Sequence, residues 1–295
     1  MAIDVFAAIR ELGTEIAPPM LGGSQALFAP FAPRATPDAC AVERDIPYGP
    51  DARHRLDIFH PPRNTARPSE GARPVLAFVH GGGFVGGDKG APDAPFYSNV
   101  GAWAVKNGLV GVTLTYRLAP GAGWPAGPED LALALEWLAA NVSRFGGDPG
   151  RLVLIGQSAG AVHVAGCVAG QHRRGTAPPL AGAIMLSGVY DLLVLRHSPF
   201  EAAYFGSDRG RFAEASTLEP LTRTDVPCLF TVSELDPPSF QQQAARLVEA
   251  WWAARGAWPR MLYQQGHNHI SPILQLGTTW DTLGGDLMAF IRRVT

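Results

Sequence analysis

Three groups of residues along the chain have the types and spacing that acyl transfer through a serine requires. The first is Gly156-Gln157-Ser158-Ala159-Gly160, which follows the apolar run 152–155. A buried apolar run of this length is typical of a parallel strand, and the small residues after it favour a helix packed on a sheet. Glycines on both sides of a serine at such a turn leave room for a sharp backbone bend that exposes the serine Oγ. We therefore predict that Ser158 is a nucleophile rather than part of a turn without chemistry.

The second group is His80-Gly81-Gly82-Gly83-Phe84, directly after the apolar run 75–79. Three consecutive glycines let backbone N–H groups point toward a substrate without obstruction, which is what an oxyanion hole requires. A phosphate-binding loop is the alternative, but this segment has neither G-x-x-x-x-G-K-S/T nor G-x-G-x-x-G. We predict an oxyanion hole here, with His80 bracing the loop rather than acting as a base.

The third group consists of two later loops that offer the remaining parts of a proton relay. A serine needs a histidine to take its proton and a carboxylate to orient that histidine, and the expected chain order is serine, acid, histidine. One loop contains Glu234 and Asp236, and a later loop contains His267 and His269. Two prolines after Asp236 stiffen its loop, which favours Asp236 over Glu234 as the acid. The choice between His267 and His269 depends mainly on a resemblance described below.

The elements that must position these groups alternate between strands and helices. Apolar runs predict strands at 75–79, 109–115, 152–155, 181–186, 228–233 and 260–264, and the segments between and after them predict helices at 92–107, 128–141, 161–170, 239–255 and 279–293. Residues 41–46 and 55–59 alternate about a turn, which predicts an antiparallel hairpin at a sheet edge. The pattern predicts an α/β fold over residues 41–295, with a mostly parallel central sheet and helices on both faces.

Two segments outside this alternation are candidates for covering the site. Residues 2–17 have apolar residues near helical spacing, and residues 18–37 form an apolar, proline-rich segment that we expect to be irregular. We predict a helix and arm over residues 1–40 that either forms a small lid or packs on the surface. The stretch 190–224 is longer than an ordinary connection and mixes aromatic with charged residues, so we expect it to line part of a pocket.

Composition and charge disfavour several classes of function. The 295 residues include 24 Lys and Arg against 26 Asp and Glu, a net charge of −2, which argues against nucleic acid or an anionic membrane as the main partner. The three cysteines lack C-x-x-C spacing and the histidines lack His-Glu-x-x-His spacing, so we expect buried free thiols and no metal or other cofactor. The first residues lack the basic start and unbroken apolar core of a signal peptide, and no apolar run could span a bilayer. We therefore predict a cytoplasmic protein without membrane insertion.

Four motifs together resemble the α/β-hydrolase superfamily, in particular its hormone-sensitive-lipase-like carboxylesterases and the related kynurenine formamidases. The matching residues are His80-Gly81-Gly82-Gly83-Phe84, Tyr116-Arg117-Leu118-Ala119-Pro120, Gly146-Gly147-Asp148-Pro149 and the turn at Ser158. The resemblance covers the chain from about residue 48 onward and implies an α/β-hydrolase fold. It implies the following site: Ser158 as nucleophile, Asp236 as acid, His269 as base, and the N–H groups of Gly82, Gly83 and Ala159 as the oxyanion hole.

The chain departs from the lipase-like pattern beside the serine. Those esterases carry an acidic residue before the serine and a glycine pair after the alanine, whereas this chain has Gln157 and Gly160-Ala161. The runs 187–191 and 234–240 are closer to the formamidases. The resemblance therefore implies a serine carboxylesterase with a small-molecule ester substrate, and an arylformamidase or small amidase is the alternative.

The size of the substrate and the assembly are further expectations. Phe84, Trp124 and the proline-rich arm indicate a confined apolar pocket, which favours short-chain or small aryl esters that form an acyl-enzyme. A homodimer is one option that the resemblance implies. A ligand-binding protein of the same fold without catalysis is disfavoured, because both later loops retain suitable residues.

Overall fold

A computed structural model describes residues 4–36, 38–62, 71–172, 178–195 and 198–295. In this part of the chain, eight strands form one sheet in the order β1-β2-β4-β3-β5-β6-β7-β8. Their bounds are β1 Ala41–Pro47, β2 Arg55–His60, β3 Arg73–Val79, β4 Val110–Leu114, β5 Gly147–Gln157, β6 Gly182–Leu186, β7 Cys228–Leu235 and β8 Met261–Asn268. β2 pairs antiparallel with both β1 and β4, and every other pair of neighbours is parallel. The sheet therefore confirms the predicted edge hairpin and the mostly parallel α/β-hydrolase fold.

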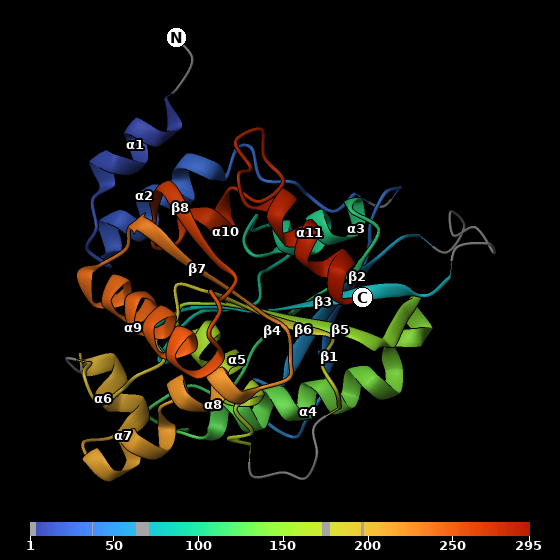
Figure 1. Cartoon of the computed structure of the whole chain (residues 1–295). Helices are drawn as coiled ribbons and strands as arrows, with labels where there is room; N and C mark the ends of the chain where they lie inside the picture. Colours follow the sequence, from blue (N-terminus) through green and yellow to red (C-terminus); the bar gives the residue numbers. More distant parts are fainter. Residues whose placement is uncertain (1–3, 37, 63–70, 173–177, 196–197) are drawn as a thin grey trace.

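Helices cover both faces of this sheet (Figure 1). Their bounds are α1 Val5–Leu12, α2 Pro18–Phe28, α3 Ser98–Lys106, α4 Ala126–Asn141, α5 Ala159–Val168, α6 Pro199–Phe205, α7 Arg209–Ala215, α8 Leu218–Arg223, α9 Pro238–Arg255, α10 Ser271–Leu274 and α11 Gly284–Val294. Within the described ranges, no helix is both long enough and apolar enough to span a bilayer.

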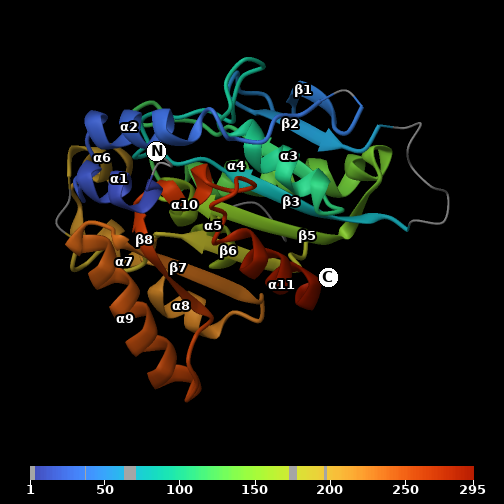
Figure 2. The ribbon, with the colours of Figure 1, turned by 90° about the horizontal axis from the view of Figure 1, so that it is seen from above.

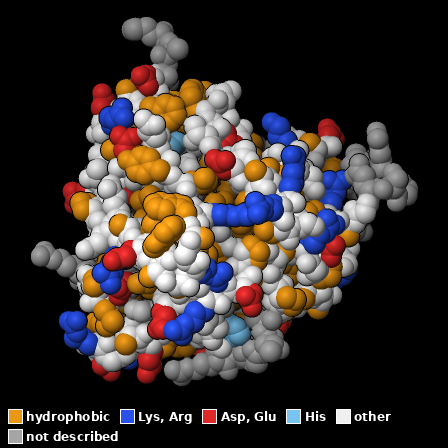
Figure 3. Space-filling view, in the orientation of Figure 1, with side chains coloured by type: hydrophobic (Ala, Val, Ile, Leu, Met, Phe, Trp, Pro, Cys, Tyr) orange, Lys and Arg blue, Asp and Glu red, His pale blue; other side chains and the backbone are white. Residues whose placement is uncertain are grey.

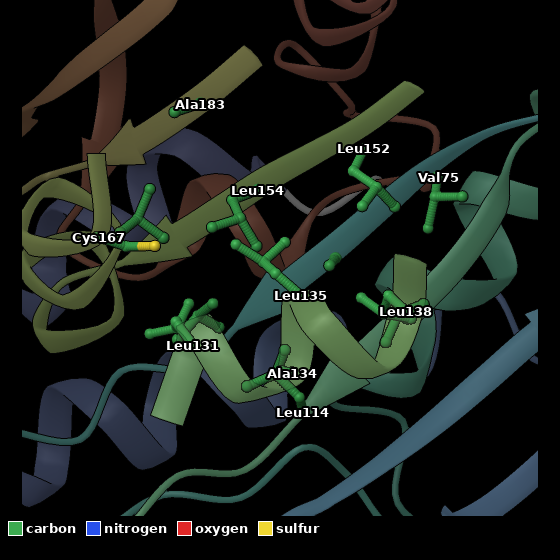
Figure 4. Packing of buried hydrophobic residues seen from close by; sticks show 14 of the residues in the cluster. Val75, Leu114, Leu131, Ala134, Leu135, Leu138, Leu152, Leu154, Cys167 and Ala183 are labelled. Carbon is green, nitrogen blue, oxygen red and sulfur yellow. The ribbon is translucent and has the colours of Figure 1, made fainter. Parts of the chain in front are cut away.

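Alternation along the central strands divides the core into two layers. In β3, Val75, Ala77 and Val79 pack with residues of α4, α5, α8 and α9. Leu76 and Phe78 of the same strand face the opposite layer, which contains residues of α1, α2, α3, α10 and α11. Successive side chains of a strand point to opposite faces, so a continuous apolar run is what a strand covered on both sides needs. Figure 4 shows part of the first layer, where leucines of α4 pack against Leu152 and Leu154 of β5.

The N-terminal segment differs from the prediction. The first helix is shorter than residues 2–17, and the segment predicted to be irregular contains the helix α2. Pro18 and Pro19 occupy the first turn, where a missing N–H costs nothing, and Met20, Ser24 and Phe28 recur every four residues on a buried face. The expectation of an irregular arm was therefore wrong, because tertiary packing outweighs the glycines and prolines. Figure 2 shows α1 and α2 beside β8 and α10, and contacts join α1 to β8 and α2 to α10.

Two other helices begin later than predicted. α3 begins at Ser98 rather than at residue 92, and α11 begins at Gly284 rather than at residue 279. Before α11, the Asp281 carboxylate accepts hydrogen bonds from the N–H groups of Leu283 and Gly284, so these residues form a turn instead of helix.

The state of the cysteines and the distribution of charged side chains match what the composition predicts. Cys40, Cys167 and Cys228 are free and buried, as predicted, and burial raises the pKa of each thiol. On the face shown in Figure 3, Lys and Arg side chains are interspersed with Asp and Glu. This mixture fits the net charge of −2.

Candidate active site

Ser158 lies at a sharp turn between β5 and α5. Its φ is +56°, in the region that a residue with a side chain rarely adopts. A Cβ on Gly156 would lie 2.3 Å from the carbonyl oxygen of Gly160, and a Cβ on Gly160 would lie 2.1 Å from that of Val79. Both distances are too short for a real Cβ atom, so each of these two positions needs glycine for the backbone to bend this closely. The turn presents the Ser158 hydroxyl at the end of the strand.

The imidazole of His269 lies between Ser158 and Asp236. Its Nε2 is 2.8 Å from Ser158 Oγ, and its Nδ1 is 2.6 Å from Asp236 Oδ1. A carboxylate only accepts, so Nδ1 carries the proton and Nε2 is free to accept the hydroxyl proton of Ser158. The register of β7 and β8 pairs Leu235 with Asn268, the residues directly before Asp236 and His269. Two adjacent parallel strands therefore deliver the acid and the base side by side.

Asp236 is held through both of its carboxylate oxygens. Its Oδ2 accepts hydrogen bonds from Ser187 Oγ and from Ser233 N, both at 2.7 Å. The residue is 1% exposed, so these protein partners rather than bulk water satisfy the oxygen. These contacts fix the rotation of the carboxylate, so Oδ1 stays directed at His269.

The competing candidates lie outside this relay. His267 Nδ1 is 2.9 Å from Ser271 Oγ and its Nε2 is 3.0 Å from Thr282 Oγ1, while burial lowers the pKa of His267 to about 4. Glu234 accepts hydrogen bonds from Gly266 N at 2.6 Å and from Arg10 Nη2 at 3.3 Å. The structure thus brings together Ser158, Asp236 and His269, and it assigns Glu234 and His267 to neighbouring contacts.

The glycine loop after β3 places backbone N–H groups next to Ser158. Gly82 and Gly83 have φ values of +129° and +58°, and a Cβ on Gly82 would lie 2.2 Å from the carbonyl oxygen of Gly86. No acceptor among the described residues takes up the N–H groups of Gly82, Gly83 and Ala159, and all three residues line the same cavity as Ser158. This arrangement can bind a negatively charged oxygen.

His80 supports the glycine loop from behind. Its Nδ1 is 2.7 Å from the Gly81 carbonyl oxygen, so Nδ1–H donates, and Nε2 is left as an acceptor 3.3 Å from Arg53 Nη2. The ring stacks on Tyr116 with centroids 4.4 Å apart, and Tyr116 Oη donates to the His80 carbonyl oxygen. Burial lowers the pKa of His80 to about 4, which keeps the ring neutral. These contacts fit the predicted bracing role.

A cavity of about 690 Å³ opens over Ser158. Its walls come from the glycine loop, from α2 and Ile16 just ahead of it, from α6 and the loop before it, and from the start of α9. Most of the side chains are apolar, among them Leu21, Phe84, Leu195, Phe200 and Phe240. The two segments expected to cover the site, residues 1–40 and 190–224, therefore both contribute to its walls.

Phe84 and Trp124, the two pocket candidates, differ in position. Phe84 lines the cavity and stacks on Tyr204 with centroids 4.6 Å apart. Trp124 is not among the described residues of the cavity wall; it packs in the aromatic cluster behind Phe84, and its Nε1 donates to Gln171 Oε1. A buried indole with a hydrogen-bond partner is a packing residue here, so the cavity wall excludes Trp124.

In the described ranges, no group of three or more His, Cys, Asp or Glu side chains is placed to bind a metal ion. The remaining polar contacts near Ser158 were not predicted. Ser187 follows β6 directly, and Gln157 Nε2 donates to the His269 carbonyl oxygen at 3.0 Å. A serine at the carboxyl end of a core strand is a signal that could have identified Ser187.

Comparisons with known proteins identify the family of this chain. The family described as alpha/beta hydrolase fold matches residues 76–252. Isoprenylcysteine alpha-carbonyl methylesterase of Arabidopsis thaliana is 36% identical over 126 residues, which cover 43% of this chain and 27% of that protein. Esterase LipQ of Mycobacterium tuberculosis is 30% identical over 226 residues, which cover 69% of this chain and 52% of that protein. The chain thus spans about a quarter to a half of the length of these curated relatives.

Solved structures share the whole architecture. Esterase B of Lactobacillus rhamnosis, crystallised with a tributyrin phosphonate inhibitor, superimposes with a TM-score of 0.75 at 17% identity, covering 99% of this chain and 96% of that one. At this level of identity, the similarity shows the fold.

Proposed function

This chain belongs to the α/β-hydrolase-fold family, and from that premise we propose that it is a serine carboxylesterase that acts on small esters. The observation that carries the proposal is the unbroken pair of hydrogen bonds from Ser158 Oγ to His269 Nε2 and from His269 Nδ1 to Asp236 Oδ1. A serine hydroxyl becomes a competent nucleophile only when such a base can remove its proton.

Acylation begins when Ser158 Oγ attacks the ester carbonyl carbon and His269 Nε2 takes the hydroxyl proton. Asp236 stabilises the imidazolium that forms and holds its orientation. The carbonyl oxygen becomes an oxyanion, which the N–H groups of Gly82, Gly83 and Ala159 bind. Ala159 is the first residue of α5, so the positive end of that helix dipole adds to the stabilisation.

The tetrahedral intermediate then collapses with cleavage of the bond to the alcohol oxygen. His269 returns its proton to that oxygen, and the alcohol leaves while the acyl group stays on Ser158. A water molecule repeats the sequence: His269 removes its proton, the hydroxide attacks the acyl carbon, and the proton returns to Ser158 Oγ as the acid departs.

The size and lining of the cavity support short-chain or small aryl esters. A volume of about 690 Å³ must hold both the acyl and the alcohol parts of the substrate. Phe84, Phe200 and Phe240 supply aromatic surface beside Ser158. A confined apolar site of this kind binds compact apolar groups.

A series of p-nitrophenyl esters from acetate to dodecanoate tests this proposal. We expect kcat/KM to be highest for the short acyl chains and to fall for the long ones. Ser158→Ala removes the attacking oxygen without adding volume, and we expect it to abolish turnover of every ester. A maximum at dodecanoate would contradict the proposed substrate size, and residual activity above a trace in the Ala variant would mean that another residue is the nucleophile.

An arylformamidase or small amidase is the second candidate, because the same relay cleaves an amide bond. The observation in its favour is the aromatic wall, together with Gln157 in place of the acidic residue beside the serine. Parallel assays with N-formylkynurenine and p-nitrophenyl acetate separate the two. A higher kcat/KM for the formamide would replace the esterase proposal.

A further inference from the structure

Helix α2 presents two different faces near the active site. Met20, Ser24 and Phe28 lie on its buried face. Leu21 and Gln25 line the cavity over Ser158. The helix therefore contacts both the substrate space and the interior of the protein, and the two faces need not act in the same way.

The buried face makes one polar contact with the segment that carries His269. Asn268 Nδ2 donates a hydrogen bond to Ser24 Oγ at 2.8 Å, and both residues are 0% exposed. The two residues are 244 positions apart in the sequence. A buried amide needs a partner, so this hydrogen bond specifies how α2 docks on the end of β8.

The orientation of the Asn268 amide is fixed by its other contacts. Asn268 Oδ1 accepts hydrogen bonds from the backbone N–H groups of Ser271 at 3.0 Å and Ile270 at 3.3 Å. Backbone N–H groups only donate, so the oxygen must face them and the NH₂ group must face Ser24. Asn268 thus links the turn that follows His269 to the N-terminal helix.

We propose that Ser24 is a positioning residue for the base of the relay: through Asn268 it holds the backbone from which His269 reaches Ser158 and Asp236. This inference rests on the proposed function. Asn268 directly precedes His269, so loss of the Asn268 amide's contacts would loosen the backbone that keeps the imidazole 2.8 Å from Ser158 Oγ. Displacements of this kind reduce the rate of the chemical step more than they weaken substrate binding.

Helix α1 restrains the same turn from a second direction. The Phe6 ring packs edge-on against His267 with centroids 5.4 Å apart. Arg10 pairs with Glu234, which in turn accepts the N–H of Gly266. The N-terminal helices therefore support residues 266–268 through apolar contact, an ion pair and the buried hydrogen bond of Ser24.

Steady-state kinetics of Ser24→Ala on a short p-nitrophenyl ester test the proposal, with active sites titrated so that only folded enzyme is counted. We expect kcat to fall about tenfold while KM changes less than about twofold, because the substrate walls are unchanged and only the base is loosened. Leu21→Ala, on the other face of the same helix, should do the opposite, raising KM with little change in kcat.

Phe28→Leu is the matched control for loss of stability, since it truncates a buried side chain of α2 that has no hydrogen bond to Asn268. We expect it to lower the unfolding midpoint as Ser24→Ala does but to keep the wild-type kcat. If Ser24→Ala does not fold, Ser24→Cys replaces it, because a thiol keeps the volume and accepts a hydrogen bond only weakly.

A kcat within about twofold of wild type in the Ala or Cys variant would overturn the positioning role, and so would an equal loss of kcat in Phe28→Leu. These outcomes are distinct from failure of the proposed function. If the proposed function were wrong, the wild-type protein itself would hydrolyse none of the esters.

Discussion

The serine side and the histidine side of the relay meet at a hydrogen bond of 2.8 Å, but they are built by different means. The serine side consists of two glycine-bearing turns that follow the neighbouring strands β3 and β5. Close backbone packing dominates it, and the space for a Cβ is absent at Gly82, Gly156 and Gly160. The histidine side depends on side-chain hydrogen bonds between segments far apart in the chain.

Because the two sides are built differently, we expect substitutions to affect them differently. At the serine side, a Cβ added at Gly82, Gly156 or Gly160 collides with main-chain atoms, which move less easily than side chains. At the histidine side, Ser187, Ser233 and Ser24 act on Asp236 and Asn268 through single hydrogen bonds. We therefore expect large losses of activity where the backbone is crowded or a relay member is removed, and smaller losses where one supporting hydrogen bond is cut.

The largest expected effect separates the two histidines at the end of β8. His269→Gln removes the base, and we expect kcat/KM to fall on the order of 10⁴-fold, as for loss of a relay member elsewhere. His267→Gln is the matched control, because Gln can still hydrogen-bond and, in the described part of the chain, the polar partners of the His267 ring are Ser271 and Thr282. Steady-state kinetics on p-nitrophenyl acetate measure both. Equal losses would show that the histidine side was assigned to the wrong ring.

The next effect concerns the acid. Asp236→Asn keeps the shape but presents an NH₂ group to His269 or loses the contact to Ser187, and we expect kcat to fall on the order of 10³- to 10⁴-fold with the fold intact. Glu234→Gln should cost far less, because its hydrogen bonds to Arg10 and Gly266 lie away from the relay. Activity in the Asn variant close to that of the Gln variant would refute the role of Asp236.

An intermediate effect tests the crowding of the serine side. Gly82→Ala places a Cβ against the Gly86 carbonyl oxygen at φ +129°, so the loop must shift and an N–H donor leaves the oxyanion position. We expect kcat to fall about 10²- to 10³-fold, as for removal of one oxyanion donor.

Gly285→Ala is the control for adding a methyl group. Apart from its chain neighbours and the backbone of its own helix, no described atom lies within 4 Å of its Cβ position. Because Gly285 belongs to α11, we expect full activity and a gain in stability of up to about 1 kcal/mol. Full activity in Gly82→Ala would mean that the glycine loop does not bind the oxyanion.

The smallest effect is a pH dependence of stability that belongs to the buried histidines. Burial lowers the pKa of His267 to about 4, while the unfolded chain has the ordinary value near 6.5. The unfolded state binds more protons between these pH values, so stability is fully present above about pH 6.5 and falls as the pH drops toward 4.

Chemical denaturation at pH 7 and pH 4.5 measures this loss. We expect His267→Gln to remove on the order of 2 kcal/mol of the pH-dependent change, because Gln does not titrate. His80 and His163, whose pKa values burial also lowers, should keep part of the dependence in the variant. An unchanged pH profile in the variant would show that His267 is not protonated on unfolding in this range.

The serine side could be predicted from the sequence because its signals are local. The two glycines around Ser158 lie within one stretch of five residues, the three glycines after His80 are consecutive, and each group follows an apolar run. The mostly parallel sheet follows from the same alternation of apolar segments, since β-α-β units place consecutive strands parallel.

The histidine side could be predicted only in part. Asp236 was separable from Glu234 by its prolines, but the choice of His269 over His267 needed a family resemblance, because a turn can direct either ring at the serine. The contact of Ser24 with Asn268 joins residues 244 positions apart and has no local pattern. This contact also requires residues 18–28 to form a helix, and the prolines and glycines of this segment argue against a helix when the sequence is considered alone. Trp124 likewise could not be excluded from the cavity until the packing behind Phe84 was known.

The most direct test of the relay is the rate at which a fluorophosphonate modifies Ser158, followed by peptide mass spectrometry in the wild-type protein and in His269→Gln. The account predicts a single adduct on the peptide that contains Ser158 in the wild-type protein and almost none in the variant over the same time. An adduct on another residue, or equal rates in the two proteins, would contradict the claim that His269 activates Ser158.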